Sequence, residues 1–206
     1  MKVLMVDVDG VLVHGRPDDG LHFTTYLERD LGLSSTLLQR EFFQRHWAEI
    51  VAGRQPIEPC LSEVLAKIAP RLSIQTLLDY WFENDARLDH QLLADLASLR
   101  KQGTRLCLAT NQEHRRATYL RDVLGLGQSF EAIFYSADLG VAKPAPEFFR
   151  LATERVGTEP DEIAFIDDSE ANVTAARSFG WNAIHWTAFS SLADTLARLN
   201  QAATRL

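Results

Sequence analysis

Two aspartates, Asp7 and Asp9, follow the apolar residues VLMV near the start of the chain. In an extended backbone, residues two positions apart project to the same side, so both carboxylates can face one site. Two close carboxylates repel each other unless a cation lies between them or one of them is protonated. The pair therefore predicts a site that holds a metal ion and uses one carboxyl group as an acid or base.

Further polar groups follow later apolar runs of the chain. Thr110 and Asn111 come directly after RLCLA, and they offer a hydroxyl group and backbone donors to phosphate oxygens. Lys143 lies in GVAKPAPEFF, where the two flanking prolines stiffen the loop that presents its ammonium group. Asp167 and Asp168 follow EIAFI, and they offer the hard oxygen ligands that Mg²⁺ prefers. Together these groups predict a phosphoryl-transfer site.

The segments that carry these groups alternate between strands and helices. Short apolar runs predict strands buried on both faces at residues 2–6, 105–109, 132–135, 162–166 and 182–186. Helical spacing of leucines predicts a helix over 89–101 with Asp89 as its cap, and further helices are predicted from Pro146 and over 171–178. This alternation predicts an α/β fold with a Rossmann-like, doubly wound parallel sheet, whose sites lie at the carboxyl ends of the strands.

Residues 17–88 interrupt this alternation. They contain no convincing strand, and amphipathic helical patterns recur at 23–31, 36–50, 61–68 and 74–82. We therefore expect an inserted helical cap domain at 17–88, with residues 1–16 and 89–206 forming the core domain.

Composition and charge exclude several classes of protein. The 206 residues are 46% hydrophobic and 24% charged, and no apolar run approaches the roughly 20 residues that span a bilayer. The net charge is −7 and there is no basic tract, which argues against nucleic acid as a partner. Asp7 and Asp9 interrupt the N-terminal apolar stretch before a signal peptide could form, so we expect a cytoplasmic protein. Monomer and dimer both remain open.

The two cysteines predict neither a metal site nor a redox pair. Cys60 and Cys107 are far apart in the sequence, and neither has another Cys or a His at metal-ligand spacing. Both are expected to pack in the core.

Four ordered motifs resemble those of the haloacid dehalogenase superfamily. They are DVDGV at 7–11, LATN at 108–111, Lys143 in KPAPEFF, and IDDSEAN at 166–172. The cap between the first two motifs is similar to the small helical caps of that superfamily. The KP and DDxxxN details resemble the branch that contains sugar-phosphate phosphatases and the N-terminal phosphatase domain of soluble epoxide hydrolases. The resemblance implies a magnesium-dependent phosphatase that acts on a small phosphorylated metabolite, with sugar phosphates favoured.

The resemblance also implies roles for individual residues. Asp7 would attack phosphorus and form an aspartyl-phosphate. Asp9 would protonate the leaving alkoxide and then deprotonate the water that hydrolyses the intermediate. Thr110, the backbone of Asn111, and Lys143 would stabilise the equatorial oxygens of the phosphoryl group.

The same resemblance implies a set of metal ligands. Mg²⁺ would be held by the Asp7 carboxylate, the Asp9 backbone carbonyl and Asp168, with Asp167 assisting directly or through water. Many members of the superfamily carry an acidic residue four positions after the metal-binding Asp of the last motif, whereas this chain has Asn172. The division of metal duties between Asp167 and Asp168 therefore stays open.

Three alternative functions compete with a phosphatase. A phosphomutase would use the same Asp7 and Asp9 but return the phosphoryl group to a second hydroxyl. A non-catalytic binding module would have no need to retain the complete set of catalytic groups. A haloacid dehalogenase is opposed by Asp9, because the haloacid-cleaving members lack an acid at that position.

Several other residues could contact a substrate but have simpler interpretations. His14, Arg16 and Arg54 are expected to be solvated residues. Aromatic residues at helical spacing usually pack in a core, so structural roles are expected for Phe42, Phe43, Trp47, Trp81 and Phe82 in the cap and for Trp181 and Trp186 near the last strand.

Overall fold

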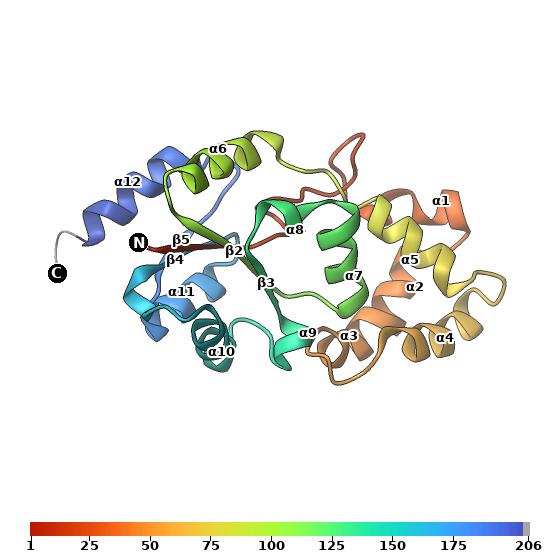
Figure 1. Cartoon of the computed structure of the whole chain (residues 1–206). Helices are drawn as coiled ribbons and strands as arrows, with labels where there is room; N and C mark the ends of the chain where they lie inside the picture. The colour runs from red at the N-terminus through yellow and green to blue at the C-terminus, as the bar shows by residue number, and fades with distance from the viewer. Residues whose placement is uncertain (204–206) are drawn as a thin grey trace.

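The chain is described here by a computed structural model that covers the backbone of residues 1–203 and the side chains of residues 1–199. Its centre is a parallel sheet in the order β3-β2-β1-β4-β5 (Figure 1). The strands are β1 (Val3–Val6), β2 (Arg105–Thr110), β3 (Ala132–Tyr135), β4 (Ile163–Asp167) and β5 (Asn182–His185). The predicted strands and the predicted doubly wound α/β fold are confirmed, with strand ends shifted by one residue at most.

The register of the central strands determines which site residues become neighbours. Val6 of β1 pairs with Leu108 of β2 on one side and with Ile166 of β4 on the other. The next residue along β1 is Asp7, so it lies level with Asp167 at the end of β4. Because the strands are parallel, all the groups that follow them reach the same edge of the sheet.

Helices cover both faces of the sheet, because alternate strand residues point to opposite sides. Leu4 and Val6 pack with α6 (His90–Lys101) and α12 (Leu192–Ala203), whereas Val3 and Met5 pack with α10 (Pro146–Val156) and α11 (Glu170–Phe179). Figure 1 shows the first pair of helices on one side of the sheet and the second pair on the other. Local signals agree with these helices: Asp89 accepts a hydrogen bond from the Leu92 N–H at the start of α6. Short helical segments that the sequence did not predict follow β2 and β3, namely α7 (His114–Thr118), η3 (Tyr119–Val123), α8 (Leu126–Ser129) and α9 (Ser136–Leu139).

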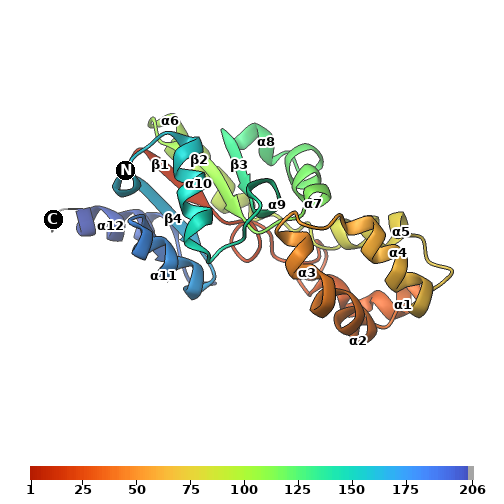
Figure 2. The ribbon, with the colours of Figure 1, turned by 90° about the horizontal axis from the view of Figure 1, so that it is seen from below.

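The segment between β1 and α6 is helical. Its elements are η1 (Phe23–Tyr26), α1 (Leu27–Leu31), α2 (Ser35–Leu38), η2 (Gln39–Phe43), α3 (Gln44–Val51), α4 (Ile57–Ile68) and α5 (Ile74–Glu83). Their apolar side chains form one hydrophobic cluster, which includes Phe42, Leu61 and Leu78. This cluster is separate from the two hydrophobic clusters that lie on the two faces of the sheet. Figure 2 shows these helices grouped together on one side of the sheet.

Two short linkers connect this helical segment to the sheet, and they pair with each other. Val13 and Leu88 form an antiparallel bridge. The His14 N–H donates to the Arg87 carbonyl at 2.9 Å, and the Arg87 N–H donates to the Gly15 carbonyl at 3.0 Å. The segment therefore leaves the sheet and returns to it through one two-stranded ribbon.

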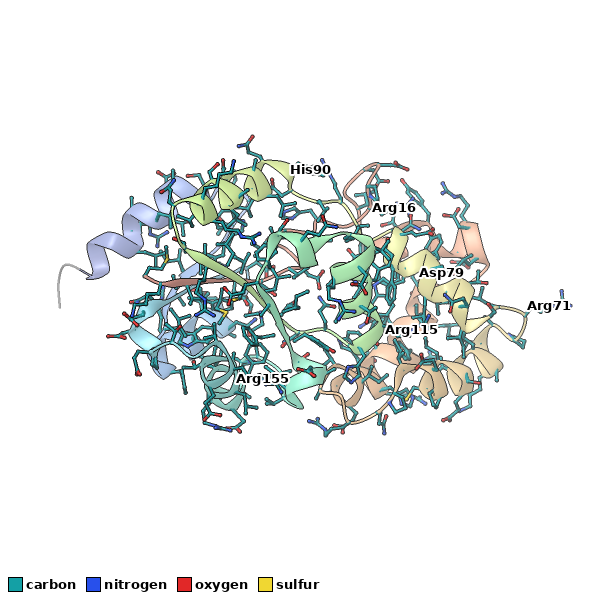
Figure 3. The ribbon with its side chains drawn as sticks, viewed as in Figure 1. Arg16, Arg71, Asp79, His90, Arg115 and Arg155 are labelled. Atoms are coloured by element: carbon teal, nitrogen blue, oxygen red, sulfur yellow. The ribbon has the colours of Figure 1, made fainter. Side chains whose placement is uncertain are left out.

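One side chain in the first linker differs from its expectation. Arg16 was expected to be solvated, but only 8% of it is exposed (Figure 3). Its guanidinium group donates to the Tyr80 hydroxyl at 3.3 Å and lies 4.8 Å from the centre of the Tyr26 ring. The expectation was wrong because the ring stacking and hydrogen bond come from α5 and η1, which lie next to Arg16 only in the folded chain. Arg54, by contrast, is exposed and pairs with Glu49.

Within residues 1–203, the structure contains no helix long and apolar enough to cross a membrane.

Candidate active site

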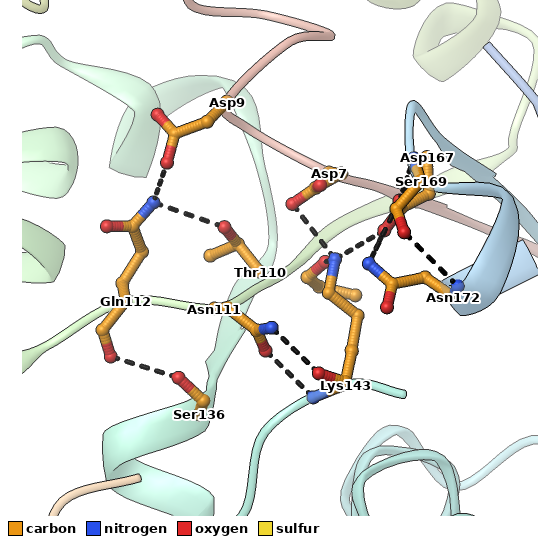
Figure 4. Close-up of polar contacts among 11 residues, drawn as sticks. Asp7, Asp9, Thr110, Asn111, Gln112, Ser136, Lys143, Asp167, Ser169 and Asn172 are labelled. Carbon is orange, nitrogen blue, oxygen red and sulfur yellow. Dashed lines mark hydrogen bonds and ion pairs between the residues drawn. The ribbon is translucent and has the colours of Figure 1, made fainter. Parts of the chain in front are cut away.

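A buried lysine joins the ends of three strands. The Lys143 ammonium group lies 3.0 Å from Asp7 Oδ1 and 2.5 Å from Asp167 Oδ2, and it donates to the Ala109 carbonyl at 2.7 Å (Figure 4). An ammonium group has three hydrogens, so these three acceptors satisfy it fully. Lys143 is only 4% exposed, and Asp167 is completely buried. The structure therefore brings together three of the residues that the sequence singled out.

The loop that carries Lys143 is held by Asn111. The Asn111 side-chain amide donates to the Lys143 carbonyl at 2.9 Å, and its oxygen accepts from the Lys143 N–H at 2.8 Å. The bond from Lys143 to Pro144 is cis. The Asn111 side chain thus positions the lysine, while the role of the Asn111 backbone towards phosphate stays a prediction.

Asp167 is surrounded by hydrogen-bond donors. Besides Lys143, it accepts from the Ser169 N–H at 2.8 Å, and both of its oxygens lie 3.0 Å from the Asn172 side-chain amide. A buried carboxylate is stable only when it is paired and hydrogen-bonded in this way. Asn172 therefore supports Asp167, a role that the sequence did not predict although it marked this position as unusual. Direct metal binding by Asp167 stays a prediction.

Three carboxylates form a cluster that fits a divalent cation. Ligand oxygens of Asp7, Asp167 and Asp168 lie within 4.8 Å of one another. Two of these residues are buried and Asp168 is exposed, so the cluster has protein on one side and an opening on the other. Carboxylate oxygens are the hard ligands that Mg²⁺ prefers, and the single positive charge of Lys143 does not balance three negative charges. The donor set therefore fits Mg²⁺.

Gly10 makes room for Asp168. A Cβ atom at this position would lie 2.2 Å from Asp168 Oδ2, and the φ angle of 78° is one that side chains rarely adopt. Gly10→Ala is expected to destabilise the fold by about 1–2 kcal/mol through backbone strain and also to displace the Asp168 carboxylate. Urea denaturation and a Mg²⁺ titration of activity measure the two effects.

Gly32 provides the matched control for this substitution. Its φ angle is 66°, and nothing lies within 4 Å of a Cβ atom there. Gly32→Ala is expected to lower stability through the same strain and to leave the Mg²⁺ dependence unchanged. An unchanged Mg²⁺ dependence in Gly10→Ala as well would contradict a metal-binding role for Asp168.

The second aspartate of the first loop is held by a glutamine. The Gln112 side-chain amide donates to Asp9 Oδ2 at 2.6 Å and lies 3.3 Å from Thr110 Oγ1 (Figure 4). Gln112 is 2% exposed, and its backbone carbonyl accepts a hydrogen bond from the Ser136 hydroxyl at 3.2 Å. The sequence did not predict this residue. It is 103 positions from Asp9, so the contact could be found only from the fold.

The environment raises the pKa of three carboxyl groups of the site, those of Asp7, Asp9 and Asp168. Burial and the nearby Asp167 charge raise the pKa of Asp7 to about 7, against the lowering effect of the Lys143 charge. Asp9 is reached by solvent, yet the surrounding protein desolvates it enough to raise its pKa, against the charge of Arg116. Desolvation and the Asp167 charge raise the pKa of Asp168. A cation bound beside these groups would favour their charged forms.

Comparison with known proteins decides the family. A family model described as haloacid dehalogenase-like hydrolase matches residues 1–180. The chain belongs to this family. The sequence-based interpretation of a hydrolase of the haloacid dehalogenase superfamily is thereby confirmed.

Named relatives of this haloacid dehalogenase-like hydrolase include phosphatases. The chain is 25% identical over 213 residues to a phosphorylated carbohydrates phosphatase from Thermotoga maritima, covering 100% of this chain and 94% of that protein. It is 27% identical over 97 residues to bifunctional epoxide hydrolase 2 from Rattus norvegicus, covering 45% of this chain. That match covers only 18% of the rat protein.

A solved structure supports the same fold. An enzyme of this superfamily from Bacteroides thetaiotaomicron, in complex with magnesium and inorganic phosphate, superposes with a TM-score of 0.79 and 20% identity. The match covers 95% of this chain and 98% of that one. At this identity the likeness establishes the shared fold of the hydrolase, including its parallel sheet.

Proposed function

We propose that this haloacid dehalogenase-like hydrolase is a magnesium-dependent phosphatase that hydrolyses a small phosphate monoester through an aspartyl-phosphate on Asp7. The observation that carries the proposal is the meeting of Asp7, Lys143 and Asp167 at the carboxyl edge of the sheet, with Asp168 in the same carboxylate cluster. The named phosphatase among its relatives supports the same class of reaction.

Asp7 is the nucleophile in this mechanism. One carboxylate oxygen attacks phosphorus in line, the bond from phosphorus to the leaving oxygen breaks, and an acyl phosphate forms. Lys143 lies 3.0 Å from Asp7 Oδ1, which fixes the carboxylate and favours its charged form. Water then attacks phosphorus, the bond to Asp7 breaks, and inorganic phosphate leaves.

Asp9 transfers the protons that these two steps require. It donates a proton to the leaving oxygen in the first step and takes a proton from the attacking water in the second. A raised pKa suits the first role, because a carboxyl group must be protonated before it can act as an acid. Gln112 holds the Asp9 carboxylate by the hydrogen bond at 2.6 Å.

Thr110 and the Asn111 N–H donate to the phosphoryl oxygens, and Lys143, whose hydrogens are held by Asp7, Asp167 and Ala109, adds its positive charge beside them as negative charge spreads in the transition state. The Asp7 carboxylate, the Asp9 carbonyl and Asp168 would hold Mg²⁺, with Asp167 beside them. When bound, the metal neutralises the charge of the nucleophile and of the phosphate, so that the two can approach each other.

We also propose that residues 17–88 act as a cap domain over this site, with residues 1–16 and 89–206 as the core domain. The separate hydrophobic cluster of the helical segment supports this division. A small phosphorylated metabolite fits beneath a cap of this size, and sugar phosphates belong in the first panel of substrates.

The decisive experiment measures release of inorganic phosphate from para-nitrophenyl phosphate with Mg²⁺ and with a chelator. We expect turnover with Mg²⁺ and a loss of at least about 10²-fold with chelator, because the uncompensated carboxylates repel the phosphate. Turnover that is equal under both conditions would contradict a magnesium-dependent mechanism. In the panel of sugar phosphates, an isomerised ester in place of released phosphate would indicate a phosphomutase.

Gln112 is expected to position Asp9 rather than to bind substrate. Gln112→Leu is expected to lower kcat about tenfold with little change in KM, since proton transfer depends on the orientation of the acid. Steady-state kinetics separate the two constants, and thermal unfolding checks the fold. Gln112→Asn keeps the amide but shortens its reach, so recovery of kcat is expected only in part. A rise in KM with unchanged kcat would contradict this role.

A further inference from the structure

A cavity of about 650 Å³ lies between the loop after β1 and the helical segment. Asp9 and Gly10 line it on the core side, and residues of η1, η2, α3 and α5 line it on the other side. This volume lies within the range of small-molecule sites, about 300–1,000 Å³. The cavity is therefore large enough for an organic group of the size of a six-membered ring.

The position of Asp9 determines what the cavity holds. Asp9 lines the cavity, whereas Asp7 and Lys143, which pair at the end of the sheet, are not among its lining residues. If Asp9 protonates the leaving oxygen, as proposed above, then that oxygen contacts Asp9 and the rest of the leaving group extends beyond it. The cavity is the space on that side of Asp9, so it takes the leaving group and not the phosphoryl group.

One wall of the cavity is made of four aromatic side chains: Phe23, Phe43, Trp47 and Trp81. Phe23 and Trp81 stack with their ring centres 5.1 Å apart, and Trp47 lies 5.4 Å from Trp81 and 5.5 Å from Phe43. Of these residues, Phe43, Trp47 and Trp81 were expected to serve only as core. They do pack against one another, but these four also present an apolar surface to the cavity.

The charges around the cavity oppose a second anionic group on the substrate. Among the described residues that line it, none is a lysine or arginine, while Asp9 and Asp85 both contribute carboxylates. Arg116 pairs with Asp85 at 3.5 Å and donates to the Phe82 carbonyl at 3.2 Å, but it is 1% exposed. Its donors are therefore committed to the protein and do not reach into the cavity.

Apart from the carboxylates of Asp9 and Asp85, the polar residues of the lining do not form a fixed set of partners for hydroxyl groups. Gln39 and Gln44 are exposed, and the His14 and His22 rings are hydrogen-bonded to their own loops. Selective recognition of hydroxyl groups relies on buried, preorganised polar groups. The aromatic wall is the more ordered feature of the cavity.

We infer that the cavity selects phosphate monoesters whose leaving group is an uncharged, apolar, ring-sized alcohol that stacks on the aromatic wall. This inference rests on the proposed function, because it takes Asp9 as the group that contacts the leaving oxygen. It goes beyond that function by naming the class of substrate, and it places apolar ring alcohols ahead of sugars and of substrates with a second anion.

Three esters with alkyl leaving groups test this selection. Cyclohexylmethyl phosphate and glucose 6-phosphate both carry the phosphate on a CH₂ group attached to a six-membered ring, and phosphoglycolate carries a carboxylate instead. We expect kcat/KM to be highest for cyclohexylmethyl phosphate and at least about tenfold lower for phosphoglycolate. A preference for phosphoglycolate or for glucose 6-phosphate would overturn the inference.

Two variants locate the selection in the cavity. Trp47→Ala is expected to lower kcat/KM for cyclohexylmethyl phosphate about tenfold, mainly through KM, and to change phosphoglycolate less than about twofold. Gln44→Arg, at an exposed position, is expected to raise kcat/KM for phosphoglycolate about fivefold. Gln91→Arg places the same charge on the exposed face of α6 as a control. Equal loss on all three esters in Trp47→Ala, together with no effect of Gln44→Arg, would refute the inference.

A binding measurement separates this inference from the proposed function. Asp7→Asn protein with Mg²⁺ is titrated with cyclohexylmethyl phosphate and with phosphoglycolate by calorimetry. Tighter binding of the cyclohexylmethyl ester supports the cavity assignment even if the wild type releases no phosphate, in which case the proposed function alone fails. Equal or tighter binding of phosphoglycolate overturns the cavity assignment even if turnover is found.

Discussion

Asp7→Asn is expected to reduce phosphate release by at least about 10³-fold while the protein remains folded. Asparagine has nearly the same shape as aspartate, and its side-chain oxygen can still accept the hydrogen bond from Lys143 at the position of Asp7 Oδ1, 3.0 Å away. It cannot form an acyl phosphate. The substitution therefore removes the nucleophile without opening a cavity at the end of β1.

Phosphate release and thermal unfolding of the same preparation measure the two parts of this expectation. Asp18→Asn makes the same chemical change at an exposed loop position and is expected to leave both unchanged. Activity of Asp7→Asn within tenfold of the wild type would rule out covalent catalysis by this residue.

Lys143→Met is expected to destabilise the fold by about 3–5 kcal/mol and to abolish turnover. The Lys143 and Asp167 side chains are both fully buried, and their charged atoms are 2.5 Å apart. Removal of the lysine leaves the Asp167 carboxylate buried with Ser169 and Asn172 as donors but with no cation against it. Leaving the Asp167 charge buried without a counter-charge costs more stability than the ion pair with Lys143 contributed.

Urea denaturation measures this loss, and two further variants interpret it. Lys67→Met breaks an exposed pair with Glu63 and is expected to change stability little. The double variant Lys143→Met/Asp167→Asn has no charge at either position, so it is expected to regain part of the lost stability while staying inactive. If the double variant is as unstable as Lys143→Met, packing of the lysine chain and not its charge accounts for the loss.

The sheet could be predicted from the sequence because each strand carries its own signal. Strand β1 is buried along its whole length, and a short apolar run such as VLMV, followed by a loop, is typical of a strand in the middle of a parallel sheet. Only a few strand orders are then possible for the sheet. The site is expected where a polar residue comes directly after an apolar strand. Asp7 and Asp167 were predicted in this way, whereas Lys143 was predicted from the proline-flanked loop GVAKPAPEFF.

The contacts of Gln112 and Asn172 could not be predicted in the same manner. Each donates to a carboxylate, Gln112 to Asp9 and Asn172 to Asp167, and an amide side chain in a loop or first helical turn carries no local sign of such a partner. The short helical segments after β2 were missed for a related reason. Segment α7 has five residues, too few to show a periodic pattern, and it is held in place by buried Arg116.

The aromatic residues of the helical segment show a different limit. Periodicity identifies Phe43 and Trp47 as members of an apolar face, and both are half-buried in the cluster of that segment. It does not tell which edge of an apolar cluster borders a cavity, because that depends on how the helices sit against the loop that carries Asp9.

The paired linkers limit how the helical segment can move relative to the sheet. Two separate strands of chain would let it twist and tilt freely, but the bonds between His14 and Arg87 and the bridge between Val13 and Leu88 tie the strands together. A two-stranded ribbon bends easily across its plane and resists bending within it. We therefore expect the segment to move about one preferred axis set by this ribbon, which would carry the aromatic wall towards or away from Asp9 once its contacts with α7 and η3 open.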